Sequence, residues 1–185
     1  MPERMAMRRS ALDGLALPSR SGVVAVGHAG AVARFLYRGD PALVDGAFGI
    51  ELPTTPMRAA VNGTRAALWL GPDEWLLLAS EGEGLSLNEA LSGALRGHPA
   101  SLVDVGHRQV GLVVAGPRAD MLLNAGCPLD LDVAAFPAGM CTRTILAKAE
   151  IVLWRTADET FRLEASRSVA PYVVAFLAEA VHGIA

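Results

Sequence analysis

The sequence predicts an α+β protein built from two lobes that repeat the order β-α-β-β-α. The first observation is an internal echo, because residues 68–80 and residues 153–166 both read as a strand, an acidic turn and a second strand ending in serine. The second is the helical spacing of apolar residues that follows each hairpin. The third is the lack of a tandem βαβ series or a glycine-rich phosphate loop, which disfavours a doubly wound nucleotide fold. Helices on one face of a mostly antiparallel sheet then give two ferredoxin-like lobes.

Three parts are expected along the chain. Residues 1–20 read as an irregular leader closed by Pro18. Residues 21–100 form the first α+β lobe and residues 101–185 the second, in one compact two-lobed unit. The boundary is placed after residues 97–99, a Gly-His-Pro run that ends a helix.

The first lobe begins with strands and a short helix. Asp40 supplies an N-cap and Pro41 the first position of a helix over residues 42–48. Asn62-Gly63 is a strong signal for a two-residue hairpin loop. Strands are predicted over residues 23–28, 32–37, 58–62, 65–70 and 75–79.

A second helix closes this lobe. Ser86 and Glu89 have the spacing of a capping box, in which each side chain satisfies the other residue's backbone N–H. Apolar residues then recur on one helical face at Leu87, Ala90, Leu91, Ala94 and Leu95.

The second lobe follows the same order. A helix is predicted after Gly116-Pro117, ending at Gly126, and the last helix is predicted to start near Ser166 or Ser168. Strands are predicted over residues 109–115, 141–146, 150–155 and 160–165. The apolar face of the last helix contains Val169, Val173, Phe176, Leu177, Ala180 and Val181.

Composition restricts the class of protein. The 185 residues are 52% apolar and 19% charged, against about 25% charged in typical soluble domains. No apolar run approaches the roughly 18 residues of a membrane span, so a membrane-spanning helix is excluded, and the apolar excess predicts a partner surface. A net charge of −3 does not favour nucleic acid.

The cytoplasm is the expected compartment. The stretch after Arg4, Arg8 and Arg9 lacks the apolar region of a secretory signal. Cys127 and Cys141 stand in no metal or redox motif, which is typical of buried thiols.

The strongest polar cluster is Asp104, His107 and Arg108, next to Gly106. One interpretation is a pocket at a strand end, with a carboxylate to orient a group, an imidazole for proton transfer and a guanidinium for an anion. The other is a turn, in which Asp104 accepts backbone N–H groups and Gly106 supplies the bend.

No other group of residues predicts chemistry. The remaining histidines lack metal-ligand spacing: His28, His98 and His182. The serines at expected helix starts lack a G-x-S-x-G context and are predicted to be N-caps: Ser80, Ser166 and Ser168. Two Asp-Glu pairs are predicted to lie in hairpin turns: Asp73-Glu74 and Asp158-Glu159.

Several segments of the chain also resemble a known protein family. Residues 68–77, Leu-Trp-Leu-Gly-Pro-Asp-Glu-Trp-Leu-Leu, resemble the signature of the gamma subunit of heterotetrameric sarcosine oxidase. The resemblance covers about residues 20–182, and Gly106 departs from the serine more usual in the family. Supporting segments in the second half are residues 103–108, 127–131, 136–139 and 167–170.

That family is similar to the folate-binding domain of the glycine cleavage T-protein, an aminomethyltransferase, and of a tRNA-modification GTPase. T-proteins have an Asp pair where this chain has Ala149 and Glu150, and an Asn where it has Ser166. Glu150 keeps a carboxylate, but these replacements argue against folate chemistry on this chain and rank a stand-alone aminomethyltransferase last.

By resemblance, the complex oxidatively demethylates sarcosine to glycine, with alpha, beta and delta subunits as partners of this chain. FAD, FMN and NAD are implied on the larger subunits, tetrahydrofolate on the alpha subunit and zinc on a small subunit. This chain is expected to be non-catalytic, with no cofactor or metal of its own. Self-association of the isolated chain stays open. The alternative is a folate-like small-molecule-binding module, with Asp104, His107, Arg108 and Glu150 as pocket candidates.

Overall fold

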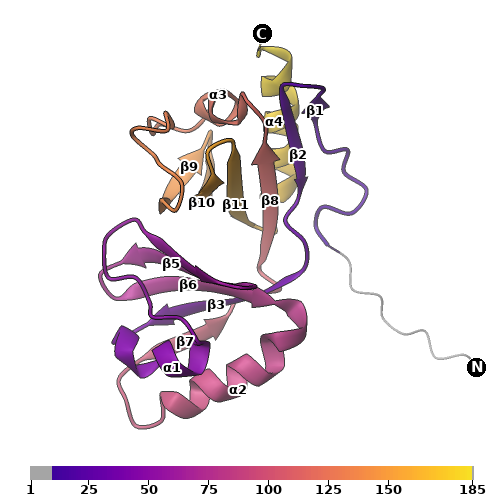
Figure 1. Cartoon of the computed structure of the whole chain (residues 1–185). Coiled ribbons are helices and arrows are strands. Elements are labelled where there is room, and N and C mark those ends of the chain that lie inside the picture. Colours follow the sequence, from indigo (N-terminus) through magenta and orange to yellow (C-terminus); the bar gives the residue numbers. More distant parts are fainter. Residues whose placement is uncertain (1–9, 185) are drawn as a thin grey trace, which may run out of the picture.

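The computed structural model describes residues 10–184, which form two antiparallel sheets with helices on their outer faces (Figure 1). The larger sheet has six strands in the order β1-β2-β8-β11-β10-β9, and the smaller has five in the order β4-β5-β6-β3-β7. The prediction of an α+β protein with two sheet-and-helix units is confirmed, and each unit contains the extra strands that complete its sheet.

The elements follow the predicted segments closely. The five-stranded sheet contains β3 (Val32–Arg38), β4 (Ala59–Asn62), β5 (Arg65–Gly71), β6 (Glu74–Ser80) and β7 (Ser101–Asp104). A 3₁₀ turn (Pro41–Leu43), α1 (Asp45–Phe48) and α2 (Gly84–Ala94) cover it. The six-stranded sheet contains β1 (Ser19–Arg20), β2 (Val24–His28), β8 (Gln109–Ala115), β9 (Cys141–Leu146), β10 (Ala149–Ala157) and β11 (Thr160–Ser166). Its helices are α3 (Ala119–Asn124) and α4 (Ala170–His182).

The strands are distributed differently from the expected lobes. β2 falls within residues 21–100, yet it pairs with β8 in the six-stranded sheet. β7 falls within residues 101–185, yet it pairs with β3 in the five-stranded sheet. Residues 21–100 therefore contribute β2 to the six-stranded sheet and residues 101–185 contribute β7 to the five-stranded sheet. Apolar patterning shows that a segment is a strand but not which strand it pairs with.

The leader is also more ordered than expected over its described part. β1 lies inside residues 1–20, and Leu12 is only 2% exposed within the core of the six-stranded sheet. Residues 1–9 lie outside the described part of the chain.

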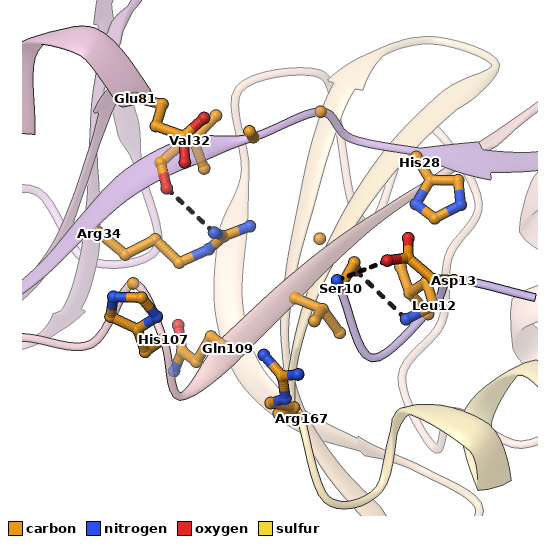
Figure 2. Close-up of a pocket in the computed structure, with 15 residues that line it drawn as sticks. Ser10, Leu12, Asp13, His28, Val32, Arg34, Glu81, His107, Gln109 and Arg167 are labelled. Carbon is orange, nitrogen blue, oxygen red and sulfur yellow. Dashed lines mark hydrogen bonds between the residues drawn. The ribbon is translucent and has the colours of Figure 1, made fainter. Parts of the chain in front are cut away.

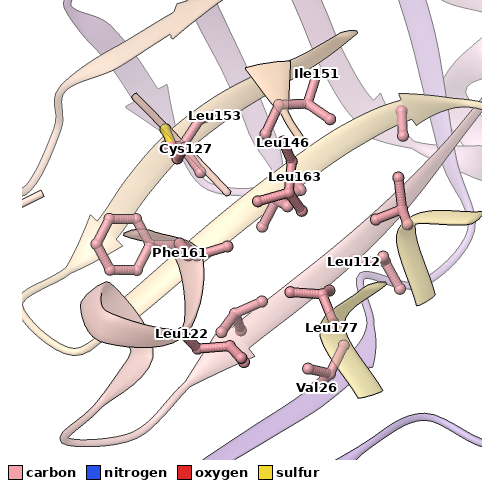
Figure 3. Close-up of a cluster of buried hydrophobic side chains, with 14 of the residues drawn as sticks. Val26, Leu112, Leu122, Cys127, Leu146, Ile151, Leu153, Phe161, Leu163 and Leu177 are labelled. Carbon is pink, nitrogen blue, oxygen red and sulfur yellow. The ribbon is translucent and has the colours of Figure 1, made fainter. Parts of the chain in front are cut away.

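Three apolar clusters fill the molecule, and most of the apolar excess is therefore core. Between the six-stranded sheet and its helices lie, among others, Val26, Leu112, Phe161, Leu163 and Leu177 (Figure 3). Between the five-stranded sheet and its helices lie Phe35, Phe48, Trp75 and Leu91. Between the two sheets lie Leu68, Leu76, Cys141 and Val152.

The internal echo corresponds to two similar hairpins, β5-β6 and β10-β11, each with a register shift just before the turn. Trp69 pairs with Trp75 before the first shift, and Arg155 pairs with Phe161 before the second. Arg155, rather than Trp154, is therefore the structural counterpart of Trp69. An alignment of the two copies by their tryptophan and Asp-Glu residues is therefore shifted by one residue from the alignment that the strand pairing gives.

Two local predictions in the first half are wrong. The capping box that opens the helical segment is formed by Ser80 and Glu83, and Ser86 lies inside α2, where its hydroxyl donates to the Glu83 carbonyl. In the β4-β5 hairpin, Asn62 pairs with Arg65. The two loop residues are therefore Gly63-Thr64 and not the predicted Asn62-Gly63.

Of the three predicted serine N-caps, Ser80 is confirmed. The other two are not, because α4 has Val169 at its N-cap position and no side-chain cap bond.

Candidate functional site

A row of polar side chains crosses the inner face of the six-stranded sheet. Gln109 at the start of β8 pairs with Ser166 at the end of β11. Glu150 on β10 lies next to this pair, and on the other side it pairs with Ile145 on β9. Because side chains of directly paired residues share a face, these four project toward the five-stranded sheet.

A buried carboxylate lies one step further along this face. Glu164 on β11 pairs with Gly111 on one side and Val152 on the other, and Val152 also pairs with Arg143. Glu164 is only 2% exposed. A buried carboxylate is stable only when counter-charges and hydrogen-bond donors surround it.

Two arginines supply those donors. Arg34 Nε donates to Glu164 Oε2 at 2.6 Å, and Arg162 Nε donates to Glu164 Oε1 at 2.7 Å. Arg34 is 4% exposed and comes from β3 of the other sheet, and its guanidinium also donates to the Val32 carbonyl at 3.1 Å. The ion cluster therefore joins the two sheets through a desolvated contact.

Gly111 makes room for this cluster. A Cβ at position 111 would lie 2.8 Å from the Cβ of Ala29, 2.9 Å from Glu164 Oε1 and 3.0 Å from a terminal nitrogen of Arg34. The position is therefore restricted to glycine by the close approach of the charged side chains.

A cavity of about 300 Å³ lies between the two sheets beside this cluster. One wall is apolar and is formed by Leu36, Leu70 and Leu76. The other wall and one end are polar and contain Arg108, Gln109, Arg143, Glu150, Glu164 and Ser166. We call this space the inter-sheet cavity.

The charges of this cavity differ in their partners. Arg143 donates to Glu74 Oε1 at 2.6 Å, and Glu164 is held by its two arginines. Arg108 and Glu150 have no side-chain hydrogen bond or ion pair with any residue from 10 to 184. Gln109 Oε1 is buried and accepts no hydrogen bond from the same part of the chain.

A second cavity of about 370 Å³ lies where the chain crosses from one sheet to the other. It contains Ser10 and Asp13 of the leader, Arg34, Arg167 and two histidines, His28 and His107. Figure 2 shows Arg34 and His107 on one side of this space and His28, Asp13 and Arg167 on the other. Gln109 lines both cavities.

The comparison with known proteins identifies the family. A model of the sarcosine oxidase gamma subunit family matches residues 38–182. The chain belongs to the sarcosine oxidase gamma subunit family.

Curated relatives agree with this assignment. The chain is 38% identical over 117 residues to the sarcosine oxidase subunit gamma of Arthrobacter sp., and 36% identical over 137 residues to that of Corynebacterium sp. strain U-96. These matches cover 62% and 73% of this chain, and 56% and 65% of the two relatives. The matched part of this chain thus spans less than two thirds of the length of either relative.

Solved structures give the same family and a wider fold group. A chain of heterotetrameric sarcosine oxidase from Corynebacterium sp. U-96 superimposes with a TM-score of 0.88 and 29% identity, covering 95% of both chains. The aminomethyltransferase T of the glycine cleavage system from Bartonella henselae superimposes with a TM-score of 0.62 at 13% identity, covering 84% of this chain and 45% of that one. The second match shows the fold alone, and it agrees with the fold that the resemblance implied.

The structure of this gamma-subunit family member divides the predicted pocket residues. Arg108 and Glu150 line the inter-sheet cavity together, whereas His107 lines the cavity at the sheet crossings. Asp104 lines neither of these two cavities. Its Oδ1 accepts the backbone N–H of Gly106 at 2.8 Å, which is the type of contact that the turn interpretation of Asp104 predicts.

Ala149 and Glu150, the positions of the T-protein acidic pair, lie on opposite faces of β10. Glu150 projects into the inter-sheet cavity, but Ala149 is 2% exposed and packs in the helix-side core. Only one of the two positions that carry the acidic pair in T-proteins therefore faces the cavity. The family assignment favours the subunit interpretation over the folate-like module.

Sequence reasoning missed Arg34, Gln109, Arg143 and Glu164. No local motif connects them, since Arg34 and Glu164 are 130 residues apart. The available signal was a charged residue between two apolar neighbours in a strand, at Arg34 between Ala33 and Phe35 and at Glu164 between Leu163 and Ala165.

The cysteines lie apart from both cavities. Cys127 and Cys141 are both free and buried. Burial raises the pKa of the Cys141 thiol to about 12, and this thiol donates a hydrogen bond to the Trp69 carbonyl at 3.6 Å. Within residues 10–184, no three His, Cys, Asp or Glu side chains gather in a way that could hold a metal ion. None of the helices in this part of the chain is long and apolar enough to cross a membrane.

Proposed function

We propose that this chain is a non-catalytic subunit of a heterotetrameric sarcosine oxidase, the complex that oxidatively demethylates sarcosine to glycine. The observation that carries the proposal is the match to a chain of such a complex over 95% of both chains, at a TM-score of 0.88. The family match over residues 38–182 supports the gamma position within it.

The partners under this proposal are the alpha, beta and delta subunits. FAD, FMN, NAD, tetrahydrofolate and zinc are assigned to those chains, and the role of this one is assembly. The internal chemistry of the chain supports that role, because the buried Glu164 pairs with Arg34 of one sheet and Arg162 of the other and so joins the sheets.

The sheet edges support a docking role. β4 and β7 are the outer strands of the five-stranded sheet, and β9 is an outer strand of the six-stranded sheet. Each carries an exposed β-branched side chain, Val61 at 59%, Val103 at 48% and Ile145 at 43% exposure. Unpaired strand edges are usually protected by charges, so apolar residues there favour contact with another chain.

The cytoplasm is the proposed compartment. Two buried cysteines that are both free fit a reducing environment.

Co-purification tests the proposal. The tagged chain is expressed with the other three candidate subunits, and the eluate is scanned for flavin absorbance. We expect stoichiometric recovery of flavin-bearing chains. Recovery of this chain alone as a stable monomer, with no flavin in the eluate, contradicts the proposal.

Matched variants sharpen the experiment. Val103→Lys places a charge on an outer strand and is expected to reduce the recovered flavin by about tenfold, the effect of an unpaired charge in an interface. Val133→Lys is the control, since Val133 is 47% exposed but lies outside the sheets. Equal recovery with both variants removes the outer strand β7 from the interface.

A further inference from the structure

The inter-sheet cavity is lined by two exposed residues of opposite charge, Arg108 and Glu150, and no described residue neutralises either. Arg108 enters it from the turn before β8, and Glu150 enters it from β10. Neither side chain has a hydrogen bond or ion pair with another residue in the range 10–184. The neighbouring charges of the same cavity, Arg143 and Glu164, are each paired within the protein.

Gln109 also lines this cavity. Gln109 Oε1 is inaccessible to solvent and receives no hydrogen bond from the described residues. Because water cannot reach this oxygen, it does not face the space that a ligand would occupy, and the charged ends of a ligand would meet Arg108 and Glu150 instead. Gln109 and Glu150 lie on strands separated only by β11, so their backbones are roughly 10 Å apart, two strand spacings of about 4.8 Å each.

The facing wall has the opposite character. Leu36, Leu70 and Leu76 of the five-stranded sheet present only apolar atoms to the cavity. Its volume of about 300 Å³ is at the lower end of ligand-binding pockets, which span roughly 300 to 1,000 Å³. The space therefore suits a molecule of few heavy atoms with one charged end and one apolar end.

We infer that the inter-sheet cavity binds a small zwitterion, an amino acid with an apolar side chain. Its carboxylate pairs with the Arg108 guanidinium, which presents two parallel N–H groups to a carboxylate. Its ammonium pairs with the Glu150 carboxylate. Its side chain packs against Leu36, Leu70 and Leu76. This site is separate from the proposed assembly role, because ligand titration and co-purification with flavin-bearing chains are independent measurements.

Three probes with the same branched alkyl body test the inference on the full chain by isothermal titration. L-leucine carries both charges, 4-methylpentanoate lacks the ammonium, and 3-methylbutylamine lacks the carboxylate. L-leucine is expected to bind saturably at one site. Each single-charge compound is expected to bind at least about tenfold more weakly, since each loses one charged hydrogen-bonding group.

Two variants assign the ends of the ligand. In Glu150→Gln, L-leucine is expected to lose its advantage over 4-methylpentanoate, and in Arg108→Gln its advantage over 3-methylbutylamine. His107→Gln is the matched control, because His107 lies one residue from Arg108 but lines the other cavity. A thermal melt of each variant verifies folding, so a lost preference is read only from folded protein.

Two results overturn the inference. One is the absence of saturable L-leucine binding to the unmodified chain. The other is an unchanged order of the three probes in both Glu150→Gln and Arg108→Gln.

Discussion

Glu164 is the residue around which the buried charges of this chain are arranged. Its two carboxylate oxygens are divided between Arg34 of one sheet and Arg162 of the other. Such a cluster contributes specificity of arrangement more than net stability, because burying the charges costs about as much as their attraction returns. Residues that give the cluster space are therefore as restricted as the charges themselves.

Gly111→Ala tests this restriction. The new methyl group would lie within 3.0 Å of Ala29, Glu164 and Arg34, and we expect a loss of about 1–3 kcal/mol in the free energy of unfolding. Gly27→Ala on the adjacent strand is the control, since nothing lies within 4 Å of its added Cβ. Chemical denaturation measures both, and equal midpoints for the two variants contradict the packing argument.

Cys141 gives a prediction about reactivity. Burial raises its pKa to about 12, so the reactive thiolate is scarce at pH 8. In a Cys127→Ser variant, where Cys141 is the remaining cysteine of the sequence, we expect iodoacetamide to label the folded protein far more slowly than the denatured protein. Mass spectrometry follows the labelling. Similar rates in the two states would show that the thiol is not protected.

The start of α2 shows how an element can be predicted while its boundary is wrong. Glu83 accepts hydrogen bonds from the Ser80 hydroxyl and backbone N–H, and from the Arg65 guanidinium at 2.7 and 3.0 Å. The Ser86-Glu89 spacing obeys the same sequence rule, but it lies within the helix. The hydrogen-bonding environment, not the spacing, selects the cap.

The pH dependence of stability distinguishes the two caps. The hydrogen bonds to Ser80 and Arg65 lower the pKa of Glu83 from 4.5 to about 2. A lowered pKa means that Glu83 contributes its stabilisation above pH 4.5, and that this is lost as the pH falls toward 2. Glu83→Gln is therefore expected to reduce the fall in Tm between pH 6 and about pH 3.

Glu89→Gln is the matched control for that measurement, since Glu89 is exposed on α2. It is expected to leave the pH dependence unchanged. The cap assignment is wrong if Glu89→Gln flattens the Tm profile and Glu83→Gln does not.

At the scale of the whole molecule, the exchange of β2 and β7 makes the two halves interdependent. β2 leaves the first half to pair with β8, and β7 leaves the second half to pair with β3. Leu12 of the leader adds to the core of the six-stranded sheet. Neither half of the sequence contains all the strands of one sheet.

Fragments cut at the expected lobe boundary test this interdependence. Residues 1–100 and residues 101–185, produced separately, are each expected to lack a cooperative thermal transition. The first fragment lacks β7, the second lacks β1 and β2, and both lack the inter-sheet contacts. Mixing them is expected to restore the circular dichroism and transition of the intact chain. A sharp transition in either fragment alone would show that the halves are autonomous.

The sequence by itself determined the elements and the family. Local periodicity and turn residues located every long strand and the helices, and the block at residues 68–77 carried the family resemblance, because these signals lie within a few neighbouring residues. It also singled out Arg108 and Glu150, which do share a cavity.

Only the tertiary structure decided which strands exchange, which residues cap α2, and how the charges are paired. Arg34 and Glu164 form a hydrogen bond although they are 130 residues apart in the sequence. Gln109 lies beside Ser166 because β8 and β11 pair in that register. Such contacts depend on pairing between distant segments, and the period of two that predicts a strand is the same whatever its partner.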